Sequence, residues 1–108
     1  MSNEKPVDTA DDVEAQLESK PKVYALFYAS WCPHSRRFLP IFEEYAKAHP
    51  DECLEVMVDF KEELCEKYDI EYYPTVLCLK EGKVEKRLDA TPGYGLTKEQ
   101  LQELVAET

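Results

Sequence analysis

The residues best suited to chemistry lie in one stretch, WCPHS at 31–35, which follows a continuous apolar run at 23–29. A cysteine at the start of a helix faces unpaired backbone N–H groups and the positive end of the helix dipole, and both stabilise a thiolate. His34, when protonated, would add positive charge, and the Ser35 hydroxyl can donate a hydrogen bond to sulfur. The pattern therefore predicts that Cys32 is a nucleophile able to form mixed disulfides.

The same stretch lacks one part of dithiol redox chemistry. In a Cys-x-x-Cys motif the second cysteine resolves the mixed disulfide, and Ser35 cannot do so. Cys53, Cys65 and Cys78 lie on other expected elements, where such residues usually behave as small buried hydrophobes. We therefore expect an adduct at Cys32 to persist until an external thiol frees it. Glutathione, another small thiol or a second thiol of the substrate would serve.

Alternating helical and strand-like patterns position this stretch. Apolar residues spaced three and four apart indicate helices, and short continuous apolar runs indicate buried strands. Thr97–Gln100 has the pattern of a capping box, which predicts the start of a final helix. In chain order we expect a helix at about 9–19, a strand at 23–29, a helix from Pro33 to before His49-Pro50, a strand at 54–58, a short helix around Leu64, two strands joined by a turn at Glu81-Gly82, and the last helix.

This order predicts an α/β fold. Strands separated by helices imply right-handed parallel crossovers, and the closing pair of strands adds antiparallel neighbours. We expect one domain over 1–108, with a central mixed sheet of four to five strands and helices on both faces. In the last strand, Val84 and Leu88 are expected to share one face.

Taken together, the motifs resemble the thioredoxin family over nearly the whole chain. FYASWCPHS resembles the junction between a strand and the active site of that family. Pro40 falls where the active-site helix of the family carries its kinking proline. YDIEYYPT resembles the stretch that ends in the cis-proline of the family, here Pro74, and LKEGK resembles its final hairpin.

The resemblance implies a thioredoxin-like fold and thiol–disulfide exchange. It also implies a substrate groove between the Cys32 loop, the segment that contains Pro74, and the loop TPGYG at 91–95. The expected catalytic residues are Cys32, His34 and Ser35, and the expected substrate-binding residues are Trp31, Pro33, Tyr73, Pro74, Thr75 and Tyr94.

Three departures from the family pattern leave the mechanism open. Pro33-His34 resembles the more oxidising disulfide-transfer members, Ser35 replaces the second cysteine, and Leu26 stands where thioredoxins bury an acid. One hypothesis is single-cysteine exchange through Cys32. A second is a Cys-to-Ser trapping variant of a CPHC dithiol oxidoreductase. A third is a non-catalytic module that binds a protein partner.

Charge and composition exclude several other classes. The net charge of −10 disfavours nucleic acid and anionic membrane surfaces as partners. No close cysteine pair suggests a zinc site, so we expect no metal and no cofactor. The polar N-terminal residues lack a signal-peptide core, which favours the cytoplasm unless a signal peptide has been removed. We expect a monomer that meets protein disulfides or thiols.

Overall fold

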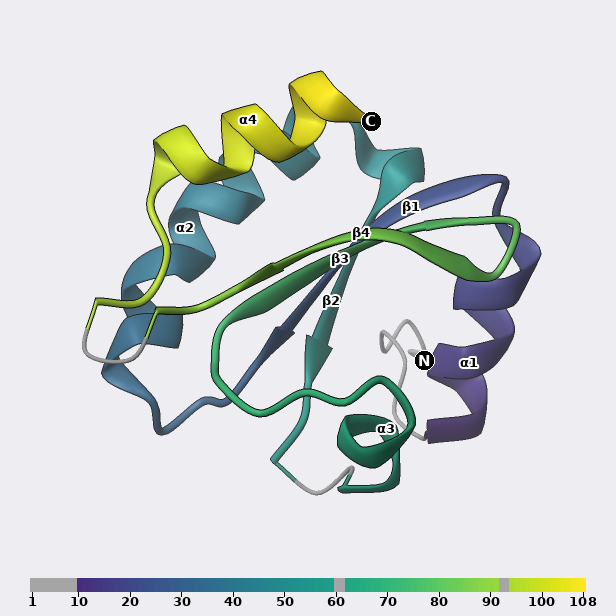
Figure 1. The fold of residues 1–108 in the computed structure, drawn as a ribbon, viewed down its shortest axis with the longest axis horizontal. Helices are drawn as coiled ribbons and strands as arrows, with labels where there is room; N and C mark the ends of the chain where they lie inside the picture. The colour runs from purple at the N-terminus through teal and green to yellow at the C-terminus, as the bar shows by residue number, and fades with distance from the viewer. Residues whose placement is uncertain (1–9, 60–61, 92–93) are drawn as a thin grey trace, which may run out of the picture.

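A four-stranded mixed sheet forms the centre of the computed structural model, which describes residues 10–59, 62–91 and 94–108. The strand order is β2-β1-β3-β4, with β1 parallel to β2 and antiparallel to β3, and β3 antiparallel to β4. Helices cover both faces of this sheet (Figure 1). The strands are β1 (Lys22–Tyr28), β2 (Cys53–Met57), β3 (Thr75–Lys80) and β4 (Lys83–Asp89). The helices are α1 (Ala10–Ser19), α2 (Pro33–Ala48), α3 (Glu62–Lys67) and α4 (Lys98–Glu107), with a 3-10 turn η1 (Pro50–Glu52).

Strand β1 is buried on both faces, and its side chains divide between two cores. Val23, Ala25 and Phe27 pack with the residues of α1 and α3, whereas Tyr24 and Leu26 pack with those of α2 and α4. The alternation follows because successive side chains of a strand point to opposite faces. The predicted α/β fold, with a mixed sheet and helices on both faces, is therefore confirmed.

The predicted capping box opens α4. The Thr97 side chain accepts a hydrogen bond from the Gln100 backbone N–H at 3.2 Å, and the Gln100 side chain accepts one from the Thr97 backbone N–H at 3.0 Å. The helix then buries Leu101 and Leu104 against α2 and the sheet. Residue 9, at which the first helix was predicted to begin, lies outside the described residues.

The hairpin between β3 and β4 differs from the sequence prediction in one respect. Both turn residues, Glu81 and Gly82, have positive φ, as a tight two-residue hairpin turn requires. The register shifts opposite Cys78 and Leu79, so that Leu79 pairs with Val84 whereas Val76 pairs with Leu88. Leu79 and Val76 belong to opposite cores. The prediction that Val84 and Leu88 share a face was therefore wrong, because an extra residue in β4 reverses the alternation.

One edge of the sheet carries an end of each of the four strands. Strands β1, β2 and β4 end there and β3 begins there, because β3 runs antiparallel to both β1 and β4. The loop between β1 and α2 leaves from this edge, and the segment before β3 enters it (Figure 1). Within the described residues, no helix has the length and apolarity needed to cross a membrane.

Candidate active site at the start of helix α2

Cys32 is the N-cap residue of α2, in extended conformation with φ −88° and ψ 122°. Pro33 occupies the first helical turn, and the carbonyl oxygen of Cys32 accepts the first helical hydrogen bond from the Arg36 N–H at 3.0 Å. The N–H groups of His34 and Ser35, which precede Arg36, have no partner inside the helix. Because Cys32 is the N-cap residue, its side chain lies at the positive end of the helix dipole, although it makes no capping hydrogen bond. Only 8% of this residue is exposed.

Ser35 stands one turn after Cys32 and is fully buried. Its hydroxyl oxygen accepts a hydrogen bond from the Ala29 backbone N–H at 3.3 Å. We had expected this hydroxyl to donate to the Cys32 sulfur. No such hydrogen bond occurs in the part of the chain that the structure describes. Ser35 therefore anchors the start of α2 to the end of β1.

The segment before β3 approaches Cys32 from the other side. The Tyr73–Pro74 peptide bond is cis, and the Cys32 Sγ lies 3.8 Å from the Tyr73 carbonyl oxygen, to which the thiol donates a weak hydrogen bond. The ring of Tyr73 meets the ring of Trp31 edge to face, with centroids 5.9 Å apart. Trp31 is 65% exposed, so this aromatic pair offers an apolar wall next to the thiol.

A pocket of about 380 Å³ lies against this aromatic wall. It is lined by Ala29, Trp31, Val58, Asp59, Glu62, Cys65, Glu66 and Tyr73. The Cys65 Sγ is 3.5 Å from the Tyr73 hydroxyl, and this hydrogen bond, together with burial, raises the pKa of Tyr73 to about 12. The Asp59 carboxylate accepts hydrogen bonds from the backbone N–H and the hydroxyl of Ser30, which fixes the loop that leads to Trp31.

A third contact joins α2 to the segment before α4. The Nη2 of Arg37 lies 3.1 Å from the Nδ1 of His34 and 2.8 Å from the carbonyl oxygen of Tyr94. Gly95 has φ +76°, and a β-carbon placed on it would lie 2.9 Å from the Cβ of His34. Thr91 and Gly95 exchange two backbone hydrogen bonds, at 3.2 and 2.9 Å. Thr91 and Gly95 are thus joined to each other, and Gly95 packs against the first turn of α2.

All four cysteines are free thiols, but their burial differs from the prediction for two of them. Cys78 is buried as expected, whereas Cys53 and Cys65 are only half-buried. Burial, with Glu52 and Glu55 nearby, raises the pKa of Cys53 to about 12. Burial also raises the pKa of Cys78. Both groups are therefore held as neutral thiols, which are poor nucleophiles.

The structure brings together most of the residues predicted for the site. Cys32, Trp31, Tyr73 and Pro74 form one cluster, with Ser35 beneath it, and His34 and Tyr94 meet at Arg37. Pro33 is exposed beside the thiol. Thr75 is separate, because its side chain is buried and its hydroxyl donates to the Tyr72 carbonyl oxygen at 2.7 Å. Leu26, at the position of the family acid, is fully buried in the core under α2.

Sequence reasoning considered Arg36 and Arg37 only as positive charges near Cys32 and did not predict the hydrogen bonds of Arg37 to His34 and Tyr94. The signal was present, because residues three apart on a helix face each other and Arg37 follows His34 by three. Its second partner, the carbonyl oxygen of Tyr94, is 57 positions away in the chain, so no local sequence pattern predicts this hydrogen bond. The aromatic partner of Cys65 was also missed, since no motif pairs a helical cysteine with Tyr73.

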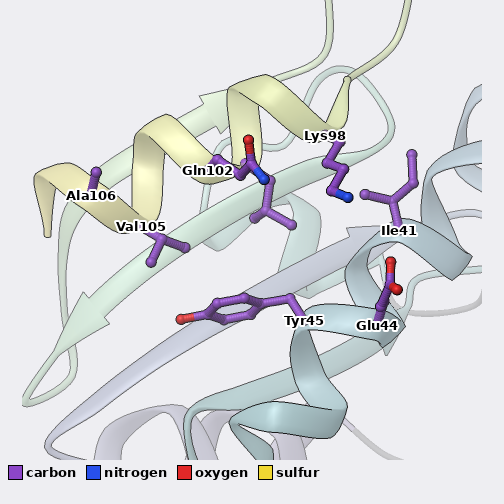
Figure 2. Close-up of a pocket in the computed structure, with 8 residues that line it drawn as sticks. Ile41, Glu44, Tyr45, Lys98, Gln102, Val105 and Ala106 are labelled. Atoms are coloured by element: carbon purple, nitrogen blue, oxygen red, sulfur yellow. The ribbon is translucent and has the colours of Figure 1, made fainter.

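Another pocket lies away from this cluster, between α2 and α4. Figure 2 shows Tyr45 of α2 opposite Val105 of α4, and Ile41 of α2 close to Lys98 at the start of α4. Its volume is about 300 Å³ and none of the predicted site residues lines it. Among the described residues, no group of three His, Cys, Asp or Glu side chains could hold a metal ion.

Comparisons with known proteins agree with this geometry. The family model described as Thioredoxin matches residues 5–107. Thioredoxin H-type of Oryza sativa subsp. indica is 36% identical over 102 residues, which cover 90% of this chain and 80% of that protein.

Solved structures give the same result. The X-ray structure of Fasciola hepatica thioredoxin is similar with a TM-score of 0.78 at 32% identity, and the match covers 92% of this chain and 93% of that one. A cysteine-to-serine mutant of Entamoeba histolytica thioredoxin is similar with a TM-score of 0.78 at 29% identity, with 94% and 96% of the two chains covered.

Proposed function

We propose that this chain, which belongs to the thioredoxin family, exchanges disulfides through a single reactive cysteine, Cys32. Thiol–disulfide oxidoreductase chemistry comes with the family. The restriction to one cysteine rests on one observation: Ser35 is buried one turn after Cys32, where a dithiol motif has its second thiol. A hydroxyl there cannot attack a mixed disulfide, so the reaction stops at the adduct until another thiol arrives.

The exchange has two balanced steps. The Cys32 thiolate attacks one sulfur of a substrate disulfide, a new sulfur–sulfur bond forms, and the other sulfur leaves as a thiolate that takes a proton from water. A thiolate from outside the chain then attacks the substrate sulfur of the mixed disulfide and releases the Cys32 thiolate. The substrate sulfur ends in a disulfide with the incoming thiol, and the oxidation state of the protein is unchanged over the cycle.

Helix α2 supports the first step and the Tyr73 segment supports recognition. The N-terminal end of a helix stabilises the thiolate by its dipole and its unpaired N–H groups. In the resting thiol, the Tyr73 carbonyl oxygen accepts the S–H at 3.8 Å, which holds the sulfur beside the aromatic wall. The pair formed by Trp31 and Tyr73 would contact apolar residues that flank the substrate cysteine.

No other thiol of the chain is placed to resolve the adduct. The raised pKa values of Cys53 and Cys78 keep these sulfurs neutral. Cys65 and Cys32 contact opposite ends of Tyr73, since one sulfur meets its hydroxyl and the other its carbonyl oxygen. The resolver is therefore external: glutathione, another small thiol, or a second thiol on a protein substrate. We propose that the chain acts as a monomer in a reducing compartment such as the cytoplasm.

Intact mass spectrometry after mixing the reduced protein with excess oxidised glutathione tests this proposal. Between about pH 4 and pH 8 we expect one added glutathione, mapped by peptide mass to Cys32, that persists until a reductant is supplied. A Cys32→Ser variant should stay unmodified. A Ser35→Cys variant is the matched control, because its second thiol should expel the glutathione and leave an internal disulfide.

Two outcomes would contradict the proposal. If native protein forms no adduct at Cys32, the remaining hypothesis is a binding module that uses the same groove. If the adduct forms and then disappears without an added thiol in the native protein, one of the other three cysteines resolves it. In that case the loss of glutathione from Cys32 should coincide with the appearance of an internal disulfide.

A further inference from the structure

Arg37 connects His34, in the first turn of α2, to the segment before α4. Its Nη2 nitrogen carries two hydrogens. It lies 3.1 Å from the Nδ1 of His34 and 2.8 Å from the carbonyl oxygen of Tyr94, so each hydrogen has one acceptor. A guanidinium has no acceptor atom and keeps its charge at all ordinary pH values. The direction of both hydrogen bonds is therefore fixed by the chemistry of arginine.

The contact has a consequence for the imidazole. Because Arg37 can only donate, the Nδ1 of His34 must accept, and in a neutral ring the proton then resides on Nε2. A proton on Nδ1 would break the hydrogen bond and set two donors face to face. His34 also touches Gly95, and within the described residues no carboxylate lies within ion-pair distance of its ring. The charged group in contact with the ring is the Arg37 guanidinium.

We propose that Arg37 is a positioning residue of the disulfide-exchange site. It fixes His34 as the Nε2–H tautomer, and it holds Tyr94 and Gly95, called here the Tyr94 segment, against the first turn of α2. This inference rests on the proposed function, because it concerns the same site. The guanidinium supplies a permanent positive charge beside His34, and the imidazole, when neutral, is oriented with its proton on Nε2.

The packing of Gly95 supports the second part of the proposal. Gly95 has positive φ, and a β-carbon on it would lie too close to His34. The Gly95 backbone therefore packs directly against the His34 side chain. Tyr94, 75% exposed, is then held in place by its own carbonyl oxygen through Arg37. A peptide substrate that reaches past the sulfur would meet this segment, whereas a small disulfide would not.

Two measurements on the full chain test the proposal. The first is the two-bond ¹H–¹⁵N spectrum of the imidazole groups, with His34 and His49 told apart by a His49→Gln variant. We expect the native His34 pattern of a protonated Nε2 and an unprotonated, hydrogen-bonded Nδ1. Arg37→Met should shift the Nδ1 signal and mix the tautomers. Arg36→Met, which removes an equal charge from a residue that does not share a face with His34, should leave the pattern unchanged.

The second measurement compares two rates of mixed-disulfide formation at Cys32. With a peptide disulfide, Arg37→Met should be slower than native by about 10-fold, because a positioned group is lost. With a small neutral disulfide, the Arg37→Met and Arg36→Met variants should differ from native by the same factor, since only a charge is removed. The ratio of the peptide rate to the small-disulfide rate should thus fall in Arg37→Met alone.

The outcomes separate this proposal from the proposed function. Native reaction at Cys32, with an unchanged His34 spectrum and an unchanged rate ratio in Arg37→Met, would overturn the role of Arg37 and leave the exchange activity standing. Failure of the native protein to react would end the proposed function. The imidazole spectrum would still decide whether Arg37 fixes His34.

Discussion

Replacement of Gly82 or Gly95 by alanine should lower the free energy of unfolding by unequal amounts, which can be worked out from the structure. Gly82 (φ +84°) and Gly95 (φ +76°) both adopt a backbone conformation that disfavours a β-carbon. At Gly82 the added carbon would lie 3.5 Å or more from its nearest neighbours, which is ordinary contact. At Gly95 it would lie 2.9 Å from the Cβ of His34 and 3.2 Å from the Nη2 of Arg37.

The backbone cost is shared, and the steric cost belongs to Gly95 alone. A left-handed alanine costs about 1–2 kcal/mol, and the lower entropy of the unfolded chain returns about 0.4–1 kcal/mol, so Gly82→Ala should lose about 1 kcal/mol. Overpacking adds about 1–3 kcal/mol at Gly95, for a total near 3 kcal/mol. In a domain of this size about 1 kcal/mol lowers Tm by about 4 °C. The expected falls in Tm are about 4 °C for Gly82→Ala and about 12 °C for Gly95→Ala.

Thermal and urea unfolding of the two variants beside the native protein measure this difference. The urea slope should stay constant, so that the change lies in stability and not in the unfolded state. Tyr94 and Gly95 could instead move away from α2 to make room for the added carbon. The loss in Tm would then be smaller, but the His34 spectrum would change, because the hydrogen bond from Arg37 to the Tyr94 carbonyl oxygen would be broken. Equal losses in both variants, with an unchanged His34 spectrum in Gly95→Ala, would refute the reasoning.

Three further predictions concern stability elsewhere in the chain. Glu55→Gln should raise the free energy of unfolding at about pH 7, because burial and then the nearby Glu43 raise the pKa of Glu55, so the folded chain resists its ionisation. The gain in stability should vanish when the pH falls below 4.5, the ordinary pKa of a glutamate, and urea titrations above and below that pH check it. Thr97→Ala should cost about 1 kcal/mol in the same titration by removing the α4 cap, and Gln100→Ala, which removes the reciprocal bond, should cost less. Ser35→Ala should cost about 1–3 kcal/mol, because it leaves a buried backbone N–H without its acceptor; a loss below 0.5 kcal/mol (roughly the floor for a lost hydrogen bond) would argue against that anchor.

The element order could be predicted from the sequence because each element carries its own local signal. The buried run at 23–29 became β1, and the capping box at Thr97 became the start of α4. The bulge in β4 had no such signal. It depends on how β4 pairs with β3, and the alternation of Val84 and Leu88 read alone gives the wrong face.

The site was predictable only in part, for a similar reason. Cys32 and Ser35 are marked by their place at a helix start, and Tyr73 and Pro74 by the family motif. Their partners lie on other elements: Cys65 of α3 contacts the Tyr73 hydroxyl from eight positions earlier, and the Tyr94 carbonyl oxygen accepts from Arg37 across 57 positions. Every residue has a backbone carbonyl group, so the sequence does not indicate which carbonyl oxygen accepts a given hydrogen bond. This part of the site is therefore evident only in the folded structure.

The meeting of the four strands' ends at one edge of the sheet also bears on the order in which the site is completed during synthesis. The sulfur of Cys32 finds the Tyr73 carbonyl oxygen 41 positions later, and Arg37 finds that of Tyr94 57 positions later. A ribosome synthesises the nucleophile early and the rest of its surroundings late. The start of α2 is therefore synthesised well before the Tyr73 and Tyr94 carbonyl oxygens that it contacts. The two sides of the site can meet only after the C-terminal third has folded onto the sheet.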